Sequence, residues 1–459
     1  MEITYDYDGT KPSPMPPHPD LLAALQVAPG LVDPPAISKM SFGRASLSAR
    51  TGTVRGLNDG TIFPDAHFQP TVPPKHMRRA ALTRAPLRGA VRVAIALVDF
   101  PDKRISPNAV QRFRDLFFST GKISTGSATE YFSEVSANKI SLTGEVVGPF
   151  RMPQTLYEYA NQQHGTSATA PNARTLAADA LKAARSSIDF APYDNDKNGY
   201  VDAFIVVHAG RGAEVTGSRN DIWSLKWVLP NVVSVNGVNV YGFLTIPEDA
   251  YVGVCAHELG HLLFGWPDLY DIDNSSEGIG NWCLMAGGSW GGSPPGVRPC
   301  HPSAWCKASQ GWVQVHAPNR NGSITVDAVS RSFEIYRLWT GGNTASKEYF
   351  LLENRARIGF DSSLPGFGLT IWHIDESKPD NSDETHYQIA LEQADGLNQL
   401  ATSTAGRGDA GDPYPGTTNN RSFTNTSTPN SQSYAGRVTG VSITNISDVA
   451  ASMTMDITV

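Results

Sequence analysis

The sequence predicts an α+β fold in which a block of mixed helices and strands precedes a region made almost entirely of strands. Between residues 88 and about 320, buried apolar runs typical of strands alternate with helical patterns. After about residue 320 the helical patterns cease, and turn-rich stretches separate short apolar or alternating runs. Residues 1–87 differ from both parts, because prolines crowd this stretch and interrupt regular structure.

The composition suits a folded protein with more than one domain. The chain has 459 residues, 40% of them hydrophobic, and a formal net charge of −7. A chain of this length typically forms two or three domains. The mild charge predicts neither a nucleic-acid partner nor a basic membrane patch, and no apolar run is long enough to span a membrane. We expect a monomer.

Residues 1–87 are predicted to be an N-terminal extension that is largely extended. Prolines recur along this stretch, and only a short helix near residues 21–26 is expected. Two interpretations fit this composition. The extension is either a prosegment that shields a functional cleft and is released near the basic pair Arg78-Arg79, or an ordered arm packed on the surface.

The segment 88–320 begins with its clearest strand, residues 91–100, which are nearly all apolar. Such a run is typical of a strand buried on both faces of a sheet. The elements that follow alternate between the two periodicities. Helices are expected around 110–118, 128–135 and 170–186, strands around 140–147, 201–207, 222–229 and 238–245, and then a helix of about ten residues ending at Gly265.

Residues 321–459 are predicted to form a β-rich, sandwich-like region. The apolar runs here are short, and turn residues separate them at intervals typical of an all-β arrangement. The expected strands lie near residues 324–326, 333–338, 349–352, 369–374, 387–391, 438–443 and 453–459.

The pattern H-E-L-G-H at residues 257–261 lies on the last helix of the middle segment. Residues four apart share one face of a helix, so His257 and His261 can direct both imidazoles at one metal ion. Glu258 can take a proton from a metal-activated water and later deliver it to a leaving amine. Apolar neighbours on both sides indicate a helix inside a cleft, not an exposed turn that happens to carry two histidines. The pattern therefore predicts a zinc-dependent endopeptidase.

A zinc site of this kind needs a third protein ligand. Gly265 can end the helix in a left-handed turn, after which the chain folds back toward the metal. Asp268 is the leading candidate, because a carboxylate oxygen is an accepted zinc ligand, and Asp271 is the second. The alternative role for Asp268 is to cap a turn. Met285 lies in a downstream glycine-rich turn, where a methionine can form an apolar floor beneath the zinc.

Residues 194–202, with the sequence D-N-D-K-N-G-Y-V-D, follow the ligand pattern of a calcium loop. The usual glutamate at the twelfth position is missing, since Ile205 stands there, and a strand follows instead of a second helix. We expect one structural calcium ion, with a metal-free acidic turn as the alternative. The expected oxygen ligands are Asp194, Asp196, Asn198, Tyr200 (through its carbonyl) and Asp202.

The cysteines and tryptophans allow more than one interpretation. The four cysteines form no C-x-x-C pair, so a cysteine-rich zinc site is not indicated. Two disulfides in an oxidising compartment and buried free thiols fit equally well. Four tryptophans are either part of a peptide cleft or, more often, of a core. These residues are Cys255, Cys283, Cys300 and Cys306, and Trp223, Trp227, Trp290 and Trp372.

From roughly residue 88 to its end, the chain resembles the immune inhibitor A family of secreted zinc metallopeptidases. The family pattern is HExxHxxGxxD, with the final aspartate as third ligand. Here three residues instead of two separate His261 from the glycine, so the resemblance implies one extra helical residue, or a local bulge, before Asp268. The matching stretches are 93–102, 131–136, 206–210, the motif with G-W-P-D-L-Y-D, M-A-G-G-S-W, 301–305, 368–376, 391–396 and 412–416.

The resemblance implies a metzincin-like catalytic domain over residues 88–320, protein or peptide substrates, and secretion. Calcium sites similar to the one expected at residues 194–202 also occur in this family. Secretion rests on the resemblance alone, because residues 1–8 are acidic and polar and lack the basic and apolar parts of a secretory signal. The alternative function is a non-enzymatic adhesion or binding protein with a relic zinc site, and the intact Glu258 favours the enzyme.

Overall fold

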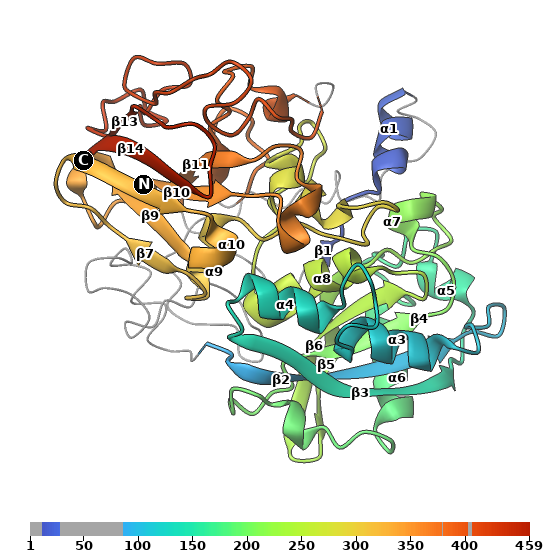
Figure 1. The fold of residues 1–459 in the computed structure, drawn as a ribbon. Coiled ribbons are helices and arrows are strands. Elements are labelled where there is room, and N and C mark those ends of the chain that lie inside the picture. Colours follow the sequence, from blue (N-terminus) through green and yellow to red (C-terminus); the bar gives the residue numbers. More distant parts are fainter. Residues whose placement is uncertain (1–11, 28–85, 379, 403–405) are drawn as a thin grey trace.

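The computed structural model describes residues 12–27, 86–378, 380–402 and 406–459 (Figure 1). A six-stranded sheet with its helices forms the lower half of the molecule in Figure 1, and a five-stranded and a three-stranded sheet lie at its upper left. Helices and strands alternate in the first part, whereas strands dominate the second. The α+β class predicted from the sequence is therefore confirmed.

The six-stranded sheet is mixed and has the order β1-β5-β6-β4-β2-β3. β2 pairs parallel with both of its neighbours, and β4 pairs parallel with β6, whereas β5 runs antiparallel to β6. From Val93 to Asp99 every residue of β2 is buried, as expected for a strand covered on both faces. The strands are β1 (Ser13–Pro14), β2 (Gly89–Asp99), β3 (Ile140–Arg151), β4 (Phe204–His208), β5 (Leu225–Val235) and β6 (Val238–Pro247).

Some helices of this part begin at a polar residue whose side chain caps the first turn. Ser127 and Glu130 form a capping box at the start of α4, and Asn172 and Thr175 form one at the start of α6. α4 packs against β3 and against α8, which carries the H-E-L-G-H motif. The helices are α3 (Ala109–Phe118), α4 (Ala128–Val135), α5 (Leu156–Ala160), α6 (Ala173–Ala184), α7 (Ala213–Thr216), α8 (Val252–Phe264) and α9 (Ala304–Ser309).

The described part of the N-terminal extension is more ordered than the sequence indicated. The expected short helix is present as α1 (Pro19–Val27), and β1 before it adds an unexpected strand to the edge of the sheet. Pro14, Met15, Pro16 and Pro17 are buried, so this stretch is packed into the protein. The basic pair Arg78-Arg79 lies outside the described residues, and the prosegment interpretation stays a prediction.

The C-terminal part contains the expected short strands. The five-stranded sheet has the order β12-β11-β10-β9-β7, and the three-stranded sheet has the order β13-β14-β8. One cluster of buried apolar residues joins residues of β8, β10, β11 and β14; a sandwich stays a prediction. The elements are β7 (Gln314–His316), β8 (Gly322–Asp327), α10 (Val329–Ser332), β9 (Glu334–Trp339), β10 (Glu348–Arg355), β11 (Gly368–Asp375), β12 (Ile389–Leu391), β13 (Ser442–Thr444) and β14 (Ser452–Thr458).

The two parts are not separate bodies, and the division at residue 320 stays a prediction. The main apolar core extends from the six-stranded sheet to Trp339 on β9, Tyr349 on β10 and Trp372 on β11. No helix among the described residues is long and apolar enough to cross a bilayer.

A buried ionic network also joins the two parts. Lys307 on α9 lies 2.6 Å from Glu353 on β10, and Arg355 bridges Glu353 and Asp361 at 3.2 and 2.6 Å. These side chains are at most 1% exposed. Burial alone would raise the pKa of Asp361, but Arg355 outweighs it and holds that pKa at about 2.

We expect Glu353→Gln to destabilise the protein by about 3–5 kcal/mol, because it leaves the buried Lys307 ammonium without its counter-charge. Urea unfolding measures this loss. The control is Lys378→Met, which removes a surface ion pair with Asp383 and should cost no more than about 1 kcal/mol. Equal losses in the two variants would contradict the importance of the buried network.

Candidate metal centre

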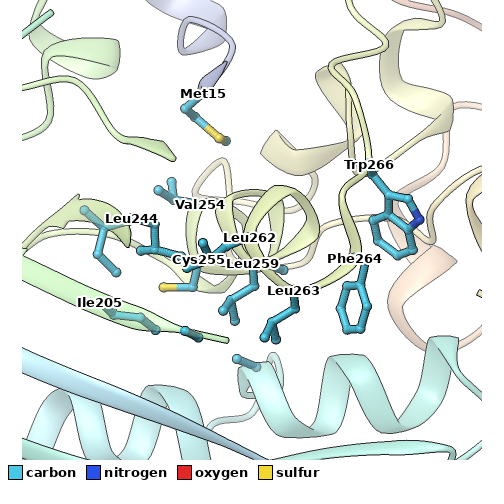
Figure 2. Packing of buried hydrophobic residues seen from close by; sticks show 14 of the residues in the cluster. Met15, Ile205, Leu244, Val254, Cys255, Leu259, Leu262, Leu263, Phe264 and Trp266 are labelled. Carbon is cyan, nitrogen blue, oxygen red and sulfur yellow. The ribbon is translucent and has the colours of Figure 1, made fainter. Parts of the chain in front are cut away.

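Helix α8 is enclosed along its whole length, since all of its 13 residues are buried. Figure 2 shows Cys255, Leu259 and Leu263 projecting from one side of the helix into the apolar core. At its end, Gly265 adopts a left-handed conformation (φ 64°), and Trp266 N–H donates to the carbonyl of Gly260. The polar side chains of the motif therefore lie within the protein.

His257, His261 and Asp268 converge on one point. Their ligand atoms form a nearly equilateral triangle, with 3.1 Å between the two Nε2 atoms and 3.2 and 3.1 Å from Asp268 Oδ1 to His257 and His261. Atoms spaced in this way can all reach one ion at the roughly 2.0–2.2 Å of zinc–nitrogen and zinc–oxygen bonds. The leading third-ligand candidate from the sequence thus lies beside both histidines.

The tautomers of both histidines suit metal binding. Nδ1 of His257 lies 3.0 Å from the carbonyl oxygen of Leu284, and Nδ1 of His261 lies 2.6 Å from that of Trp266. Because a carbonyl oxygen only accepts hydrogen bonds, each Nδ1 carries the proton and each Nε2 presents a lone pair. Two such lone pairs and a carboxylate oxygen repel one another unless a cation lies between them, so this donor set fits zinc.

The extra residue between His261 and Gly265 becomes the last residue of α8. Phe264 occupies this position, and its ring packs against Trp312 and Trp266 at centroid distances of 4.9 and 5.1 Å. The helix thereby runs one residue further before Gly265 turns the chain back. The insertion is absorbed in an aromatic cluster, and Asp268 still reaches the histidines.

Asp271, the second candidate for the third ligand, lies elsewhere. Its Oδ2 accepts hydrogen bonds from the hydroxyls of Ser275 and Ser276 and from the Ser276 N–H, at 2.8–2.9 Å. These bonds hold the loop that follows the site. Asp271 is thus grouped with Asp273 and Glu384, apart from the two histidines.

Glu258 is fully buried, and neither of its carboxyl oxygens has a hydrogen-bond partner of regular geometry in the described part of the chain, although the Lys226 backbone N–H lies close enough to lower its pKa. Burial, and then the neighbouring Asp268 and Glu214 carboxyls, raise the pKa of Glu258, whereas Lys226 lowers it. Glu258 thus holds its proton more strongly than an exposed carboxyl group does.

Met285 packs directly beneath α8. A side chain added to Gly260 would place its Cβ 2.6 Å from the Met285 sulfur and 3.0 Å from the Trp266 ring, so any larger residue there would force the Met285 side chain to move. Met285 also accepts a hydrogen bond from Leu269 N–H through its carbonyl. The methionine thus supports both the helix and the segment that carries Asp268.

The predicted calcium loop is a tight turn of converging oxygens. Asp194, Asp196 and Asp202 bring carboxylate oxygens within 4.8 Å of one another. The Asn198 N–H donates to Asp194 and Asp196, and the Gly199 N–H donates to Asp194 at 2.9 Å. The loop then joins the sheet, because the Val201 N–H donates to the carbonyl of Asn239.

All four cysteines are buried free thiols, as one of the two interpretations expected. The structure also brings together residues to which the sequence analysis gave no defined role. Tyr270, two residues after Asp268, donates its hydroxyl to the carbonyl of Pro14 at 3.0 Å. Trp223 and Trp290 donate their indole N–H groups to Met15 and Pro16. No sequence pattern could have predicted these three hydrogen bonds, because each joins residues more than 200 positions apart in the chain.

Comparison with known proteins identifies the segment that carries the site. Residues 91–317 match the family model of the immune inhibitor A peptidase M6 catalytic domain. The pre-pro-metalloprotease PrtV of Vibrio cholerae serotype O1 (strain M66-2) is 30% identical over 269 residues. Immune inhibitor A of Bacillus thuringiensis subsp. alesti is 32% identical over 203 residues. The segment is therefore an M6 catalytic domain of the immune inhibitor A type, and the resemblance inferred from the sequence is confirmed.

The relatives are much longer than the matched part of this chain. The match covers 47% of this chain and 29% of PrtV, and 37% of this chain and 29% of immune inhibitor A. The chain thus spans well under two thirds of either relative.

The metal-ligand assignment predicts different zinc contents for two matched substitutions. Asp268→Asn removes a carboxylate from the triangle and should weaken zinc binding by more than the roughly 10–100-fold caused by loss of a supporting hydrogen bond. Asp271→Asn should keep one zinc per chain. Elemental analysis after dialysis against a weak chelator measures both. Retention of zinc by Asp268→Asn with loss in Asp271→Asn would reverse the assignment.

Proposed function

We propose that this chain is a zinc-dependent endopeptidase, with His257, His261 and Asp268 as metal ligands and Glu258 as general base and acid. The observation that carries the proposal is the convergence of three ligand atoms within 3.2 Å beside a buried, unpartnered carboxyl group. The match to an M6 catalytic domain and the metalloprotease relatives support the same chemistry.

The residues of the chain divide the work of hydrolysis between them. Zinc, when bound, supplies a Lewis acid that acidifies water and polarises the scissile carbonyl. The carbonyls of Leu284 and Trp266 fix the imidazole protons on Nδ1, which keeps both Nε2 lone pairs directed at the ion. Glu258 accepts a proton from a water molecule while the oxygen of that water attacks the carbonyl carbon. It then returns this proton to the amine as the C–N bond breaks.

Protein or peptide substrates, secretion and a monomeric state belong to the same proposal. The substrate class and secretion rest on the family resemblance, and the relatives are named as a metalloprotease and an immune inhibitor. The alternative is a non-enzymatic adhesion or binding protein that keeps the site as a relic. The intact Glu258 and the complete ligand triangle favour the enzyme.

The decisive comparison is Glu258→Ala against the unmodified chain, with casein cleavage and bound zinc measured on the same samples. Because Glu258 moves protons and binds no metal in this scheme, the variant should keep its zinc and lose about 10²–10⁴-fold in cleavage rate. Equal cleavage by both proteins, or an unmodified chain that binds no zinc, would refute the endopeptidase.

We also propose that residues 194–202 bind one structural calcium ion. The ligands are carboxylate, amide and carbonyl oxygens, which hard cations prefer. The loop leads through Val201 into the buried strand β4, so an ion here would stabilise the sheet without taking part in catalysis.

Calcium at 100 times its dissociation constant should stabilise the unmodified chain by about 2.7 kcal/mol, seen as a rise in melting temperature. Asp196→Ala should abolish this rise because it removes one ligand. The matched control Lys197→Asn keeps the rise, since position 197 supplies no ligand and asparagine tolerates its left-handed backbone (φ 59°). A calcium response that survives Asp196→Ala would rule out this loop.

A further inference from the structure

Three aspartates of the C-terminal part converge at a place apart from the motif helix. Asp395 follows β12, and Asp409 and Asp412 lie in the segment 406–416. Each of the three offers a carboxylate oxygen, and these oxygens lie within 4.8 Å of one another. Because calcium–oxygen bonds measure roughly 2.3–2.6 Å, two oxygens bound to one calcium ion lie at most about 5 Å apart. The cluster therefore has the dimensions of a calcium site.

Asp412 is the buried member of the cluster, and one of its oxygens lacks a donor. The residue is 0% exposed. Its Oδ2 accepts hydrogen bonds from the Trp282 indole N–H and the Asp409 backbone N–H, both at 2.9 Å. Its Oδ1 has no hydrogen-bond partner among the residues that the structure describes. A buried carboxylate oxygen without a donor is costly, so Oδ1 is the oxygen left to bind an ion.

The charges around Asp412 also favour a cation. Burial raises the pKa of this carboxyl to about 6 although its two N–H donors lower it, and the Asp409 and Asp395 carboxylates add to the rise. The basic residue nearest in sequence, Arg407, pairs with Glu277 at 3.2 Å. The negative charge of the cluster is thus left for a bound cation to neutralise.

The backbone holds the carboxylates in this arrangement. The Leu397 N–H donates to Asp395 Oδ1 at 3.0 Å, and the Gly411 N–H donates to Asp409 Oδ1 at 2.6 Å. A side chain added to Gly411 would place its Cβ 2.4 Å from Asp395 Oδ2 and 3.0 Å from Asp409 Oδ1. A residue larger than glycine would therefore push the two carboxylates out of position.

A second acidic cluster of similar spacing shows what distinguishes this one. Asp271 is the buried member there, beside Asp273 and Glu384. Its Oδ2 accepts hydrogen bonds from Ser275 and Ser276, and its Oδ1 accepts one from the Asp273 N–H at 3.1 Å. Both oxygens of that buried carboxyl are satisfied by the protein itself. Spacing is common to the two clusters, whereas the buried oxygen without a donor belongs to Asp412.

We propose that Asp395, Asp409 and Asp412 bind a second calcium ion, more tightly than residues 194–202 bind theirs. In the loop 194–202, backbone N–H groups of Asn198 and Gly199 already donate to the Asp194 carboxylate. Release of an ion from the second site instead leaves Asp412 Oδ1 buried without any donor. The second ion therefore stays on the chain during dialysis that empties the loop.

This ion would fasten the C-terminal part to the turn that precedes the candidate metal centre. The Asn281 N–H donates to the carbonyl of Arg407 at 2.8 Å, and the Trp282 indole donates to Asp412. Leu284, whose carbonyl orients a histidine of the motif, follows two residues after Trp282. The site thus lies where two C-terminal segments meet the chain that supports the zinc ligands, and its role is structural.

The test is the calcium that the full chain retains after loading with calcium and dialysis against calcium-free buffer, measured by elemental analysis. We expect one ion per chain in the unmodified protein and in Asp196→Ala, and none in Asp412→Asn. Asp395→Asn should also lose the ion. This variant keeps the buried carboxyl, and asparagine can still accept from the Leu397 N–H, so it tests the site even if Asp412→Asn fails to fold.

The matched control is Asp273→Asn, which removes a charge from the acidic cluster whose buried carboxyl is satisfied, and which should retain one ion. Hydrogen exchange at the Asn281 N–H gives a second measurement. For an ion present at 100 times its dissociation constant, loss of binding should raise the opening equilibrium, and with it the exchange rate, by up to about 100-fold. Asp395→Asn should show this rise and Asp273→Asn should not.

Three results would overturn the second site. They are an unmodified chain that retains no calcium, Asp395→Asn or Asp412→Asn chains that retain one ion, and loss of the retained ion in Asp196→Ala, which would place that ion in the loop 194–202. None of these measurements depends on peptide cleavage, so the second site and the proposed endopeptidase stand or fall separately.

Discussion

The complete burial of α8 is the constraint on which the rest of the structure depends. A helix with no exposed residue needs a packing partner on every side, and different regions of the chain supply these partners. α4 and β6 contact it from the catalytic part, and Met285 packs beneath Gly260. Residues far apart in the sequence are thereby assembled around one short motif. The geometry of the proposed metal ligands is consequently a property of the whole core, and not of the helix alone.

Burial also determines the chemistry of the motif, because water cannot hydrogen-bond to its polar side-chain atoms. Each of these atoms therefore either has a hydrogen-bond partner within the protein or is left free to bind an ion or a proton. The Nδ1 groups of both histidines are satisfied by backbone carbonyls, which leaves their Nε2 atoms facing Asp268. The carboxyl oxygens of Glu258 have no partner among the described residues. Leaving such a group without a hydrogen bond is costly in a purely structural role. Its retention is understandable where the group exchanges protons during a reaction.

The local pattern of the sequence predicted the parts of this structure that local physics controls. The spacing of His257 and His261 requires only a helix, and α4 begins and ends where its sequence pattern places it. The position of Asp268 could not be predicted, because it depends on where the chain places the extra residue before Gly265. In the structure this residue, Phe264, ends α8 and packs among aromatic rings. Tyr270 was missed because its partner, Pro14, is 256 positions away and belongs to a segment that reads as irregular. Contacts of this kind follow from the assembled fold and have no periodic signal.

The ionic network between α9 and β10 bears on how such proteins can diversify. The recognised catalytic domain ends at residue 317, but the charge of Lys307 is neutralised by Glu353, well beyond that point. Trp305 likewise donates to Glu376. A recombination event that replaced all residues after 317 would remove Glu353 and leave the buried Lys307 ammonium group without a counter-charge. Selection should therefore transmit the two halves together, with shuffling of modules confined to sequence outside this shared interior.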